Sequence, residues 1–307
     1  SCAAIMYSVY NAAGRAGAGA VMGSKRLKAI AVKGKGGVVV ADPQAFNEAV
    51  FAARQSIASQ SGAAGLSIYG TAVGIPLHLE RRTLPSYNFQ HGTIENGFNL
   101  SGQWLTASPY LKRPFACATC PIACHRFTAI TSGPYAGCYS GGPEYETNSA
   151  LGSGCGTADM EVIIKANELS NLYGLDTISV GAMIQWAMES YQRGAISRKE
   201  ADGLDLSWGN ADTILTLIKK IALREGFGNL LADGIKRASE RVGKESWKWA
   251  VQVKGLEQSR NENRFSHSYG LAFAVNPRGP DHLMTECIAE RGGSVEGRAL
   301  IEKITGD

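Results

Sequence analysis

Apolar side chains recur at helical spacing over much of the chain, above all after residue 157. Five segments place apolar residues three and four positions apart: 44–59, 158–174, 177–194, 211–226 and 229–243. Asp42 and Pro43 suit the N-cap and the first turn of the first segment. The other four segments each end at a glycine, which readily adopts the left-handed backbone of a helix C-cap. The pattern therefore predicts five helices.

The first forty residues have a different pattern of apolar and glycine residues. The runs 28–34 and 37–42 are apolar or alternating over strand lengths and are bounded by glycines, which predicts β-strands. A boundary near residue 43 then separates a β region from a helical one. Residues 60–114 are rich in Gly, Ser and Pro and predict short elements, and the strand-like run 251–257 suggests a second boundary. The expected fold class is α+β, mainly α-helical.

Composition and charge describe an ordinary globular chain. Its 307 residues are 44% hydrophobic and 19% charged, enough apolar surface for a large core and two or more domains. The net charge of +4 is scattered, so neither nucleic acid nor an anionic membrane is an expected partner. No apolar run reaches the roughly 18 residues that span a bilayer. Because the chain starts without an initiator Met, we expect it to be a piece of a longer protein.

The cysteines divide into a cluster and four isolated residues. The isolated residues are each expected to be a small buried apolar side chain, and their dispersal favours a reducing cytoplasm over a secreted disulfide scaffold; they are Cys2, Cys138, Cys155 and Cys287. The cluster is 117-CATCPIAC-124, in which Cys117, Cys120 and Cys124 have the spacing C-x2-C-x3-C.

Three thiols this close indicate a soft-metal site. One loop of this spacing can wrap three corners of a four-iron cluster, with the fourth ligand coming from elsewhere. Zinc held by the three cysteines and His125 is an alternative, although adjacent ligands rarely turn to the same point. Buried thiols without a metal are the remaining alternative.

The segment 14-GRAGAGAVMG-23 leaves the backbone bare enough to approach a ligand closely. Its N–H groups could hold a phosphate, with Arg15 adding a charge-assisted bond. The segment has neither the Walker frame nor a dinucleotide fingerprint. A purely structural glycine-rich turn explains it about equally well.

Three further positions are candidates for proton transfer or ligand contact. Glu144 follows a proline and two glycines in GGPEYET, and the alternative is a helix-capping glutamate. Asp176 follows a glycine C-cap, and the alternative is an N-cap aspartate. His282 lies beside Arg278 and Asp281 in NPRGPDHL, and the alternative is a hydrogen-bonded core histidine.

Taken in order, six motifs resemble the tungsten-dependent aldehyde ferredoxin oxidoreductase family over about residues 14 to 282. They are GRAGAGAVMGSKRLKAIAV, CATCPIAC, GPEYET, NLYGLDTIS, VKGLE and NPRGPDHL. The resemblance implies a tungsten, or less often molybdenum, bis-pterin beside one four-iron four-sulfur cluster. It also implies that the chain holds the end of a pterin-binding β domain (1–43), a middle helical domain with the cluster loop (44–250) and the truncated start of a third domain (251–307).

The resemblance assigns roles to individual residues. Those expected beside a pterin phosphate are Arg15, Ala16, Gly17 and Gly19, with the Ala16 carbonyl facing a magnesium ion that links the pterins. Those expected against a pterin are Asn171, Leu175 and Asp176, although the family usually has Asp where Asn171 stands. Cys117, Cys120 and Cys124 are expected to hold the cluster, with the fourth cysteine beyond Asp307. Glu144 and His282 are expected to face the substrate as catalytic residues.

The implied function is oxidation of aldehydes to carboxylic acids with ferredoxin, or another electron-transfer subunit, as acceptor, in a homo-oligomer. After VKGLE the segment 258–279 departs from the usual aldehyde-enzyme sequence and looks more like the branch that contains the catalytic subunit of tungsten-dependent benzoyl-CoA reductase. An acyl-CoA substrate is therefore the alternative to an aldehyde. A zinc-stapled interaction module or a bare electron carrier would leave most of the six motifs unexplained.

Overall fold

Helices make up most of the ordered structure. The computed structural model describes residues 2–8, 10–284, 299, 302–303 and 306. The α-helices there are α1 (Ala18–Ser24), α2 (Pro43–Ala58), α3 (Ser61–Tyr69), α4 (Ile75–Glu80), α5 (Gly102–Ala107), α6 (Tyr145–Thr147), α7 (Met160–Tyr173), α8 (Thr177–Gln192), α9 (Ala211–Leu223), α10 (Phe227–Leu231), α11 (Ile235–Val242) and α12 (His267–Val275). The expected mainly α-helical α+β class is confirmed.

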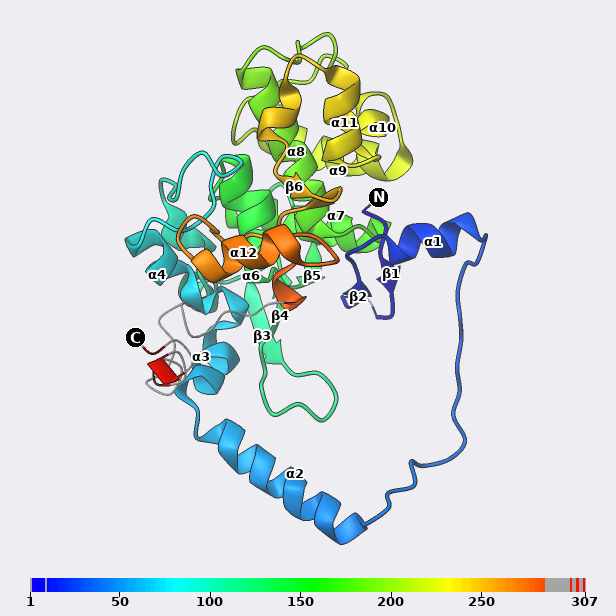
Figure 1. Cartoon of the computed structure of the whole chain (residues 1–307), viewed down its shortest axis with the longest axis vertical. Helices are drawn as coiled ribbons and strands as arrows, with labels where there is room; N and C mark the ends of the chain where they lie inside the picture. The colour runs from blue at the N-terminus through cyan, green and yellow to red at the C-terminus, as the bar shows by residue number, and fades with distance from the viewer. Residues whose placement is uncertain (1, 9, 285–298, 300–301, 304–305, 307) are drawn as a thin grey trace.

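The described strands form three small antiparallel sheets. The pairs are β1 (Ile5–Met6) with β2 (Ala12–Ala13) and β6 (Gln252–Val253) with β7 (Leu256–Glu257), and the three-stranded sheet orders β3 (Leu111–Phe115), β4 (His125–Ala129) and β5 (Tyr139–Gly141). In that sheet Phe115 pairs with His125, so the cysteine cluster lies in the loop that joins β3 to β4. Figure 1 shows this loop projecting from the helical body.

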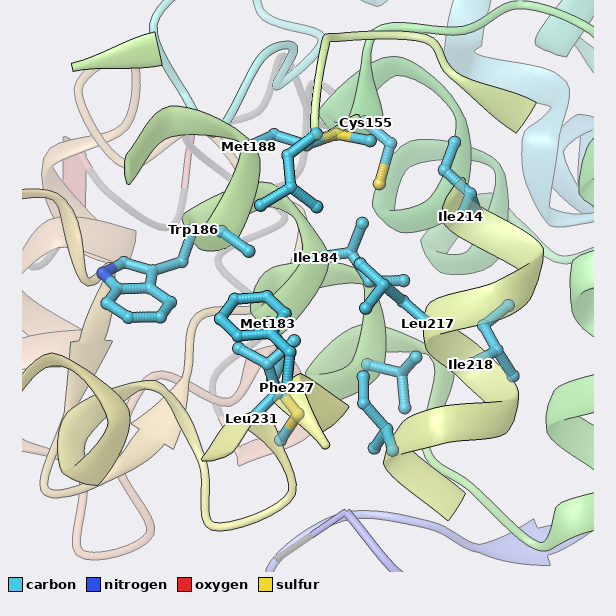
Figure 2. Close-up of a cluster of buried hydrophobic side chains, with 14 of the residues drawn as sticks. Cys155, Met183, Ile184, Trp186, Met188, Ile214, Leu217, Ile218, Phe227 and Leu231 are labelled. Carbon is cyan, nitrogen blue, oxygen red and sulfur yellow. The ribbon is translucent and has the colours of Figure 1, made fainter. Parts of the chain in front are cut away.

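The main core surrounds α8. Its residues from Ile178 to Ser190 are all buried, so the helix is enclosed on every side. Helix α9 contributes apolar residues at the i, i+3, i+4 and i+7 positions of one face, and α10 adds two more; they are Ile214, Leu217, Ile218, Ile221, Phe227 and Leu231. Figure 2 labels Ile214, Leu217, Ile218, Phe227 and Leu231 together with Cys155, Met183 and Trp186. Burial of this apolar surface stabilises the helical core from which the loops extend.

Local capping explains where the predicted helices begin and end. Asp42, Asp159 and Asp176 are N-caps whose carboxylates accept hydrogen bonds from the first free backbone N–H groups. Gly174 closes α7 in the left-handed conformation, with φ of 64°. The predicted helices at 44–59, 158–174, 177–194 and 211–226 are confirmed to within three residues at each end.

Two expectations are wrong. The segment predicted as one helix at 229–243 is broken at Gly234, whose φ of 89° cannot continue a right-handed helix, so α10 and α11 are separate. The runs 28–34 and 37–42 form no strand, because no described segment pairs with them; Val32 is 88% exposed and Val39 is 93% exposed. Figure 1 shows this stretch running from α1 away from the body to α2.

The isolated cysteines behave as expected where they are described. Cys2, Cys138 and Cys155 are buried and free, and burial raises the pKa of each thiol to about 12. Cys287 lies outside the described residues. No described helix is long and apolar enough to cross a bilayer.

Candidate active site

The glycine-rich turn begins at the end of β2 and leads directly into α1. Ala16 and Gly17 both have left-handed backbone conformations, with φ of 66° and 78°. A Cβ at Gly19 would lie 2.5 Å from the carbonyl oxygen of Ala3, so only glycine lets α1 pack against β1. Gly19 therefore serves close backbone packing, and Ala16 and Gly17 shape the turn that directs Arg15.

Arg15 points inward and pairs with Asp176. Its Nη1 lies 3.3 Å from Asp176 Oδ2, and its Nη2 donates to the Glu257 carbonyl at 2.5 Å. The two side chains are only 6% and 8% exposed. Asp176 also caps α8 by accepting from the N–H groups of Ile178 and Ser179. The N-cap alternative is thus confirmed, and the same carboxylate in addition holds the arginine across 161 residues of sequence.

Removal of the Asp176 carboxylate should lower the free energy of unfolding. Asp176→Ala should lower the free energy of unfolding by about 1 kcal/mol through the lost cap, and by about 3 kcal/mol more because Arg15 is left buried without its carboxylate. Urea unfolding measures the total. Asp159→Ala is the matched control, since Asp159 caps α7 through the same kind of bonds and should cost only about 1 kcal/mol. Equal losses in the two variants would contradict the importance of the ion pair.

A cavity of about 530 Å³ opens beside this pair. Five of the residues to which the family resemblance assigns a role line it: Arg15, Glu144, Asn171, Leu175 and Asp176. The Nε of Arg15 is buried and has no hydrogen-bond partner among the described residues. An unpaired guanidinium N–H beside a cavity suits an anionic or hydrogen-bond-accepting ligand.

Glu144 forms one wall of the cavity. It occupies the N-cap position of α6, but its side chain makes no capping hydrogen bond, so the helix-capping alternative is wrong for the carboxylate. Its Oε2 accepts from the Thr71 hydroxyl, and its Oε1 lies 3.7 Å from His125 Nδ1. The His125 Nε2 faces the Asn11 amide nitrogen at 3.3 Å, which places the ring proton of the neutral imidazole on Nδ1, toward Glu144.

His282 approaches a different carboxylate. Its Nδ1 lies 3.7 Å from Glu146 Oε1 and 3.9 Å from Asp281 Oδ1, and it has no hydrogen-bond partner among the described residues. The core-histidine alternative is therefore wrong. Glu146 lines the cavity and was missed in the sequence, although GPEYET carries two carboxylates separated by one residue. No described ion pair or hydrogen bond joins Glu144 to His282.

The cysteine loop ends directly before His125, the first residue of β4. Cys117 and Cys120 are exposed and Cys124 is partly buried, so buried thiols without a role are excluded as the explanation. Cys120 N–H donates to the Cys117 carbonyl at 3.1 Å, which closes a tight turn. Burial raises the pKa of Cys124, and the nearby Glu144 carboxylate raises it further.

The loop contains the donor set of a soft-metal site, but the three thiols do not converge on one point. Within the part of the chain that the structure describes, no three His, Cys, Asp or Glu side chains are gathered closely enough to hold a metal ion. His125 is directed to Glu144 and stacks on Phe115 at 4.7 Å. The arrangement gives no support to His125 as a zinc ligand.

Arg126 is a second residue that sequence reasoning missed. It is 2% exposed, and its guanidinium donates to the carbonyls of Ile68 and Ser67, both at 2.8 Å. It also donates to the Ala123 carbonyl in the cysteine loop. A cation at the C-terminal carbonyls of α3 is favourable, so Arg126 ties this helix to the base of the loop. The available signal in the sequence was an arginine two positions after the last cysteine of the loop.

Comparison with known proteins decides the family. The family model described as "Aldehyde ferredoxin oxidoreductase, domains 2 & 3" matches residues 48–304, and that of the N-terminal domain matches residues 1–34. The chain belongs to the aldehyde ferredoxin oxidoreductase family. The resemblance drawn from the six motifs is confirmed.

The relatives within the family are oxidoreductases. The chain is 40% identical over 289 residues to the tungsten-containing aldehyde ferredoxin oxidoreductases of Thermococcus kodakarensis and Pyrococcus furiosus, matching 94% of this chain and 47% of each relative. It is 31% identical over 299 residues to the "Aliphatic sulfonate oxidoreductase, WOR-like subunit" of Pyrococcus furiosus. The chain thus spans about half the length of these relatives.

A solved structure shares the fold. The active-site complex BamBC of benzoyl coenzyme A reductase, in complex with 1,5-dienoyl-CoA, has a TM-score of 0.70 and 19% identity, covering 91% of this chain and 43% of that one. At this identity the likeness establishes the aldehyde ferredoxin oxidoreductase-type fold, and the function is argued from the site.

Proposed function

We propose that the chain is part of a tungstopterin iron–sulfur oxidoreductase that oxidises aldehydes to carboxylic acids with ferredoxin as electron acceptor. The observation that carries the proposal is the cavity lined by the Arg15–Asp176 ion pair and by the carboxylates Glu144 and Glu146. The 40% identity to tungsten-containing aldehyde enzymes supports the same chemistry. Because the chain spans about half of those relatives, the activity belongs to a longer protein.

The cavity fits the proposed pterin cofactor. Arg15 offers a buried N–H without an acceptor, which suits a phosphate or a pterin edge. The backbone of Ala16 and Gly17 would continue this phosphate contact, with the Ala16 carbonyl toward a magnesium ion, whereas Gly19 packs against Ala3. Asn171, Leu175 and Asp176 line the same cavity and would contact the pterin. When bound, the cofactor supplies the two-electron redox chemistry.

The cysteine loop fits an iron–sulfur cluster in its donor chemistry. Cys117, Cys120 and Cys124 would bind three of its corners, and the cluster would supply one-electron transfer. Ferredoxin, or another electron-transfer subunit, is the proposed partner. A cytoplasmic homo-oligomer, the domain limits near 43 and 251, and the absence of nucleic-acid and membrane partners remain predictions.

The protein's own contribution to the reaction is proton handling and orientation. Glu146 lines the cavity, and we assign proton transfer to Glu146 Oε1 and His282 Nδ1, which lie 3.7 Å apart. Asp281 lies 3.9 Å from the same nitrogen and is itself held by Arg278 at 2.7 Å, which fixes the turn that carries the imidazole. Glu144 and His125 form a second carboxylate–imidazole pair between the cavity and the cysteine loop.

Substrate assays of the holoenzyme test the proposal. Aldehydes should drive reduction of ferredoxin, and tungsten should be present at about one atom per chain, as the bis-pterin assignment requires. The alternative is the catalytic subunit of a benzoyl-CoA reductase, which the divergent segment 258–279 favours. Turnover of an aromatic acyl-CoA without turnover of any aldehyde would establish that alternative instead.

A further inference from the structure

The buried cation at the base of the cysteine loop has only neutral partners. Arg126 is 2% exposed, and all three of its guanidinium nitrogens donate hydrogen bonds. Within the part of the chain that the structure describes, each of these bonds goes to a backbone carbonyl and none to a carboxylate. The hydrogen-bonding capacity of the guanidinium is thus used, while its positive charge is not neutralised by a contact.

The carbonyls that accept from Arg126 belong to two segments. Those of Ser67 and Ile68, both at 2.8 Å, lie in the last turn of α3, where helix carbonyls lack partners within the helix. Those of Ala123 and Cys124 lie at the end of the cysteine loop, the latter at 3.4 Å from Nε. One guanidinium therefore joins the end of a helix to the residue that carries the third thiol.

Gly70 makes this close contact possible. It ends α3 with φ of 70° and ψ of −170°, a backbone conformation that side-chain-bearing residues rarely adopt. A Cβ at this position would lie 3.1 Å from Arg126 Nε and 3.1 Å from the Cys124 carbonyl oxygen. The base of the loop is therefore packed directly against the end of the helix.

The three thiols of the loop differ in how they are held. Cys124 is partly buried, its carbonyl accepts from Arg126, and it directly precedes β4. Cys117 and Cys120 are exposed. Cys124 is thus the fixed thiol, and the exposed part of the loop has to close on it for all three thiols to bind one cluster.

We propose that Arg126 is a positioning residue that anchors Cys124 as the fixed ligand of the cluster, and that its charge makes the cluster easier to reduce. The inference rests on the proposed iron–sulfur cluster. Net charge and hydrogen bonding around a cluster set its reduction potential, and reduction adds one negative charge. A cation that is buried and not neutralised favours the reduced form, because water and salt screen it only weakly.

Redox titration of the holoenzyme, followed by the electron paramagnetic resonance signal of the reduced cluster, tests the role of the charge. Arg126→Met should shift the midpoint potential to a more negative value. At a fixed applied potential the ratio of reduced to oxidised cluster should fall by roughly 10-fold, since one buried unit charge acts with this strength over about 10 Å. Arg126→Lys keeps the charge and should keep a potential close to that of the wild type. Equal shifts in the two variants would overturn the role of the charge.

The rate at which an iron chelator removes the cluster tests the anchoring of Cys124. Both variants lose the planar fork that binds several carbonyls at once, so iron should leave faster from Arg126→Met and from Arg126→Lys than from the wild type. Arg113→Gln is the matched control, because Arg113 is an exposed arginine of β3 whose charge is screened by water. Its potential and its rate of iron loss should equal those of the wild type. Wild-type rates of iron loss in both Arg126 variants would overturn the anchoring role.

These measurements separate the inference from the proposed activity, because neither depends on turnover. If no aldehyde is oxidised but the potential shifts in Arg126→Met alone, the role of Arg126 stands and the aldehyde proposal fails. If aldehydes reduce ferredoxin while the potential and the rate of iron loss are the same in all variants, the activity stands and the role of Arg126 fails. Absence of iron from the wild-type holoenzyme would refute both.

Discussion

Replacing Cys120 by alanine in the holoenzyme is expected to abolish the visible absorbance of the proposed iron–sulfur cluster. Cys117, Cys120 and Cys124 lie in one loop at a spacing that wraps a cubane, and each thiolate would hold one corner. The wild type should contain about four iron and four acid-labile sulfide per chain, and the variant close to none. Without the cluster, aldehyde-dependent reduction of ferredoxin should fall to background.

Cys138→Ala is the control for this experiment. Cys138 is buried and free in the core, and no metal-binding group of the described residues includes it. Its loss should leave the iron content and the spectrum unchanged. A Cys120→Ala enzyme that keeps its full spectrum would disprove the cluster assignment, and zinc in place of iron in the wild type would establish the zinc alternative.

The second large effect concerns Glu146 and His282. Glu146→Gln and His282→Asn should each lower kcat by about 10²-fold or more, the scale of general acid–base catalysis, without loss of tungsten or iron. Because the two groups lie 3.7 Å apart and would serve one proton transfer, their combined loss should be less than the product of the single losses.

Glu144 distinguishes the site suggested by sequence from the site suggested by geometry. The sequence paired Glu144 with His282, whereas Glu144 lies beside His125. Glu144→Gln combined with His282→Asn should therefore give independent, multiplicative effects. If the kcat loss of His282→Asn were coupled to that of Glu144→Gln and not to that of Glu146→Gln, Glu144 and His282 would be the pair that acts together. His91→Asn, an exposed histidine that contacts Tyr87, should leave kcat unchanged.

Local rules predicted a large part of the helical region. Asp176 and Gly174 were identified as an N-cap and a C-cap, because both depend on residues within four positions along the chain. Prediction was wrong where a partner in space was needed. The run 28–34 has strand-like composition, yet a strand requires a neighbour to receive its hydrogen bonds, and the described chain supplies none.

The sequence by itself determined the family, the helical class and the donor set of the cysteine loop, because ordered motifs and short spacings are properties of neighbouring residues. Only the tertiary structure decided which side chains meet. Arg15 reaches Asp176 across 161 positions, and the backbone of Arg260 reaches Glu146 across 114. Packing around α8 brings these segments together by burying apolar surface, a driving force without direction, so the apolar pattern of the sequence predicts helices but not which segments will meet. For that reason the carboxylate that lies beside His282 could be found only in the folded chain.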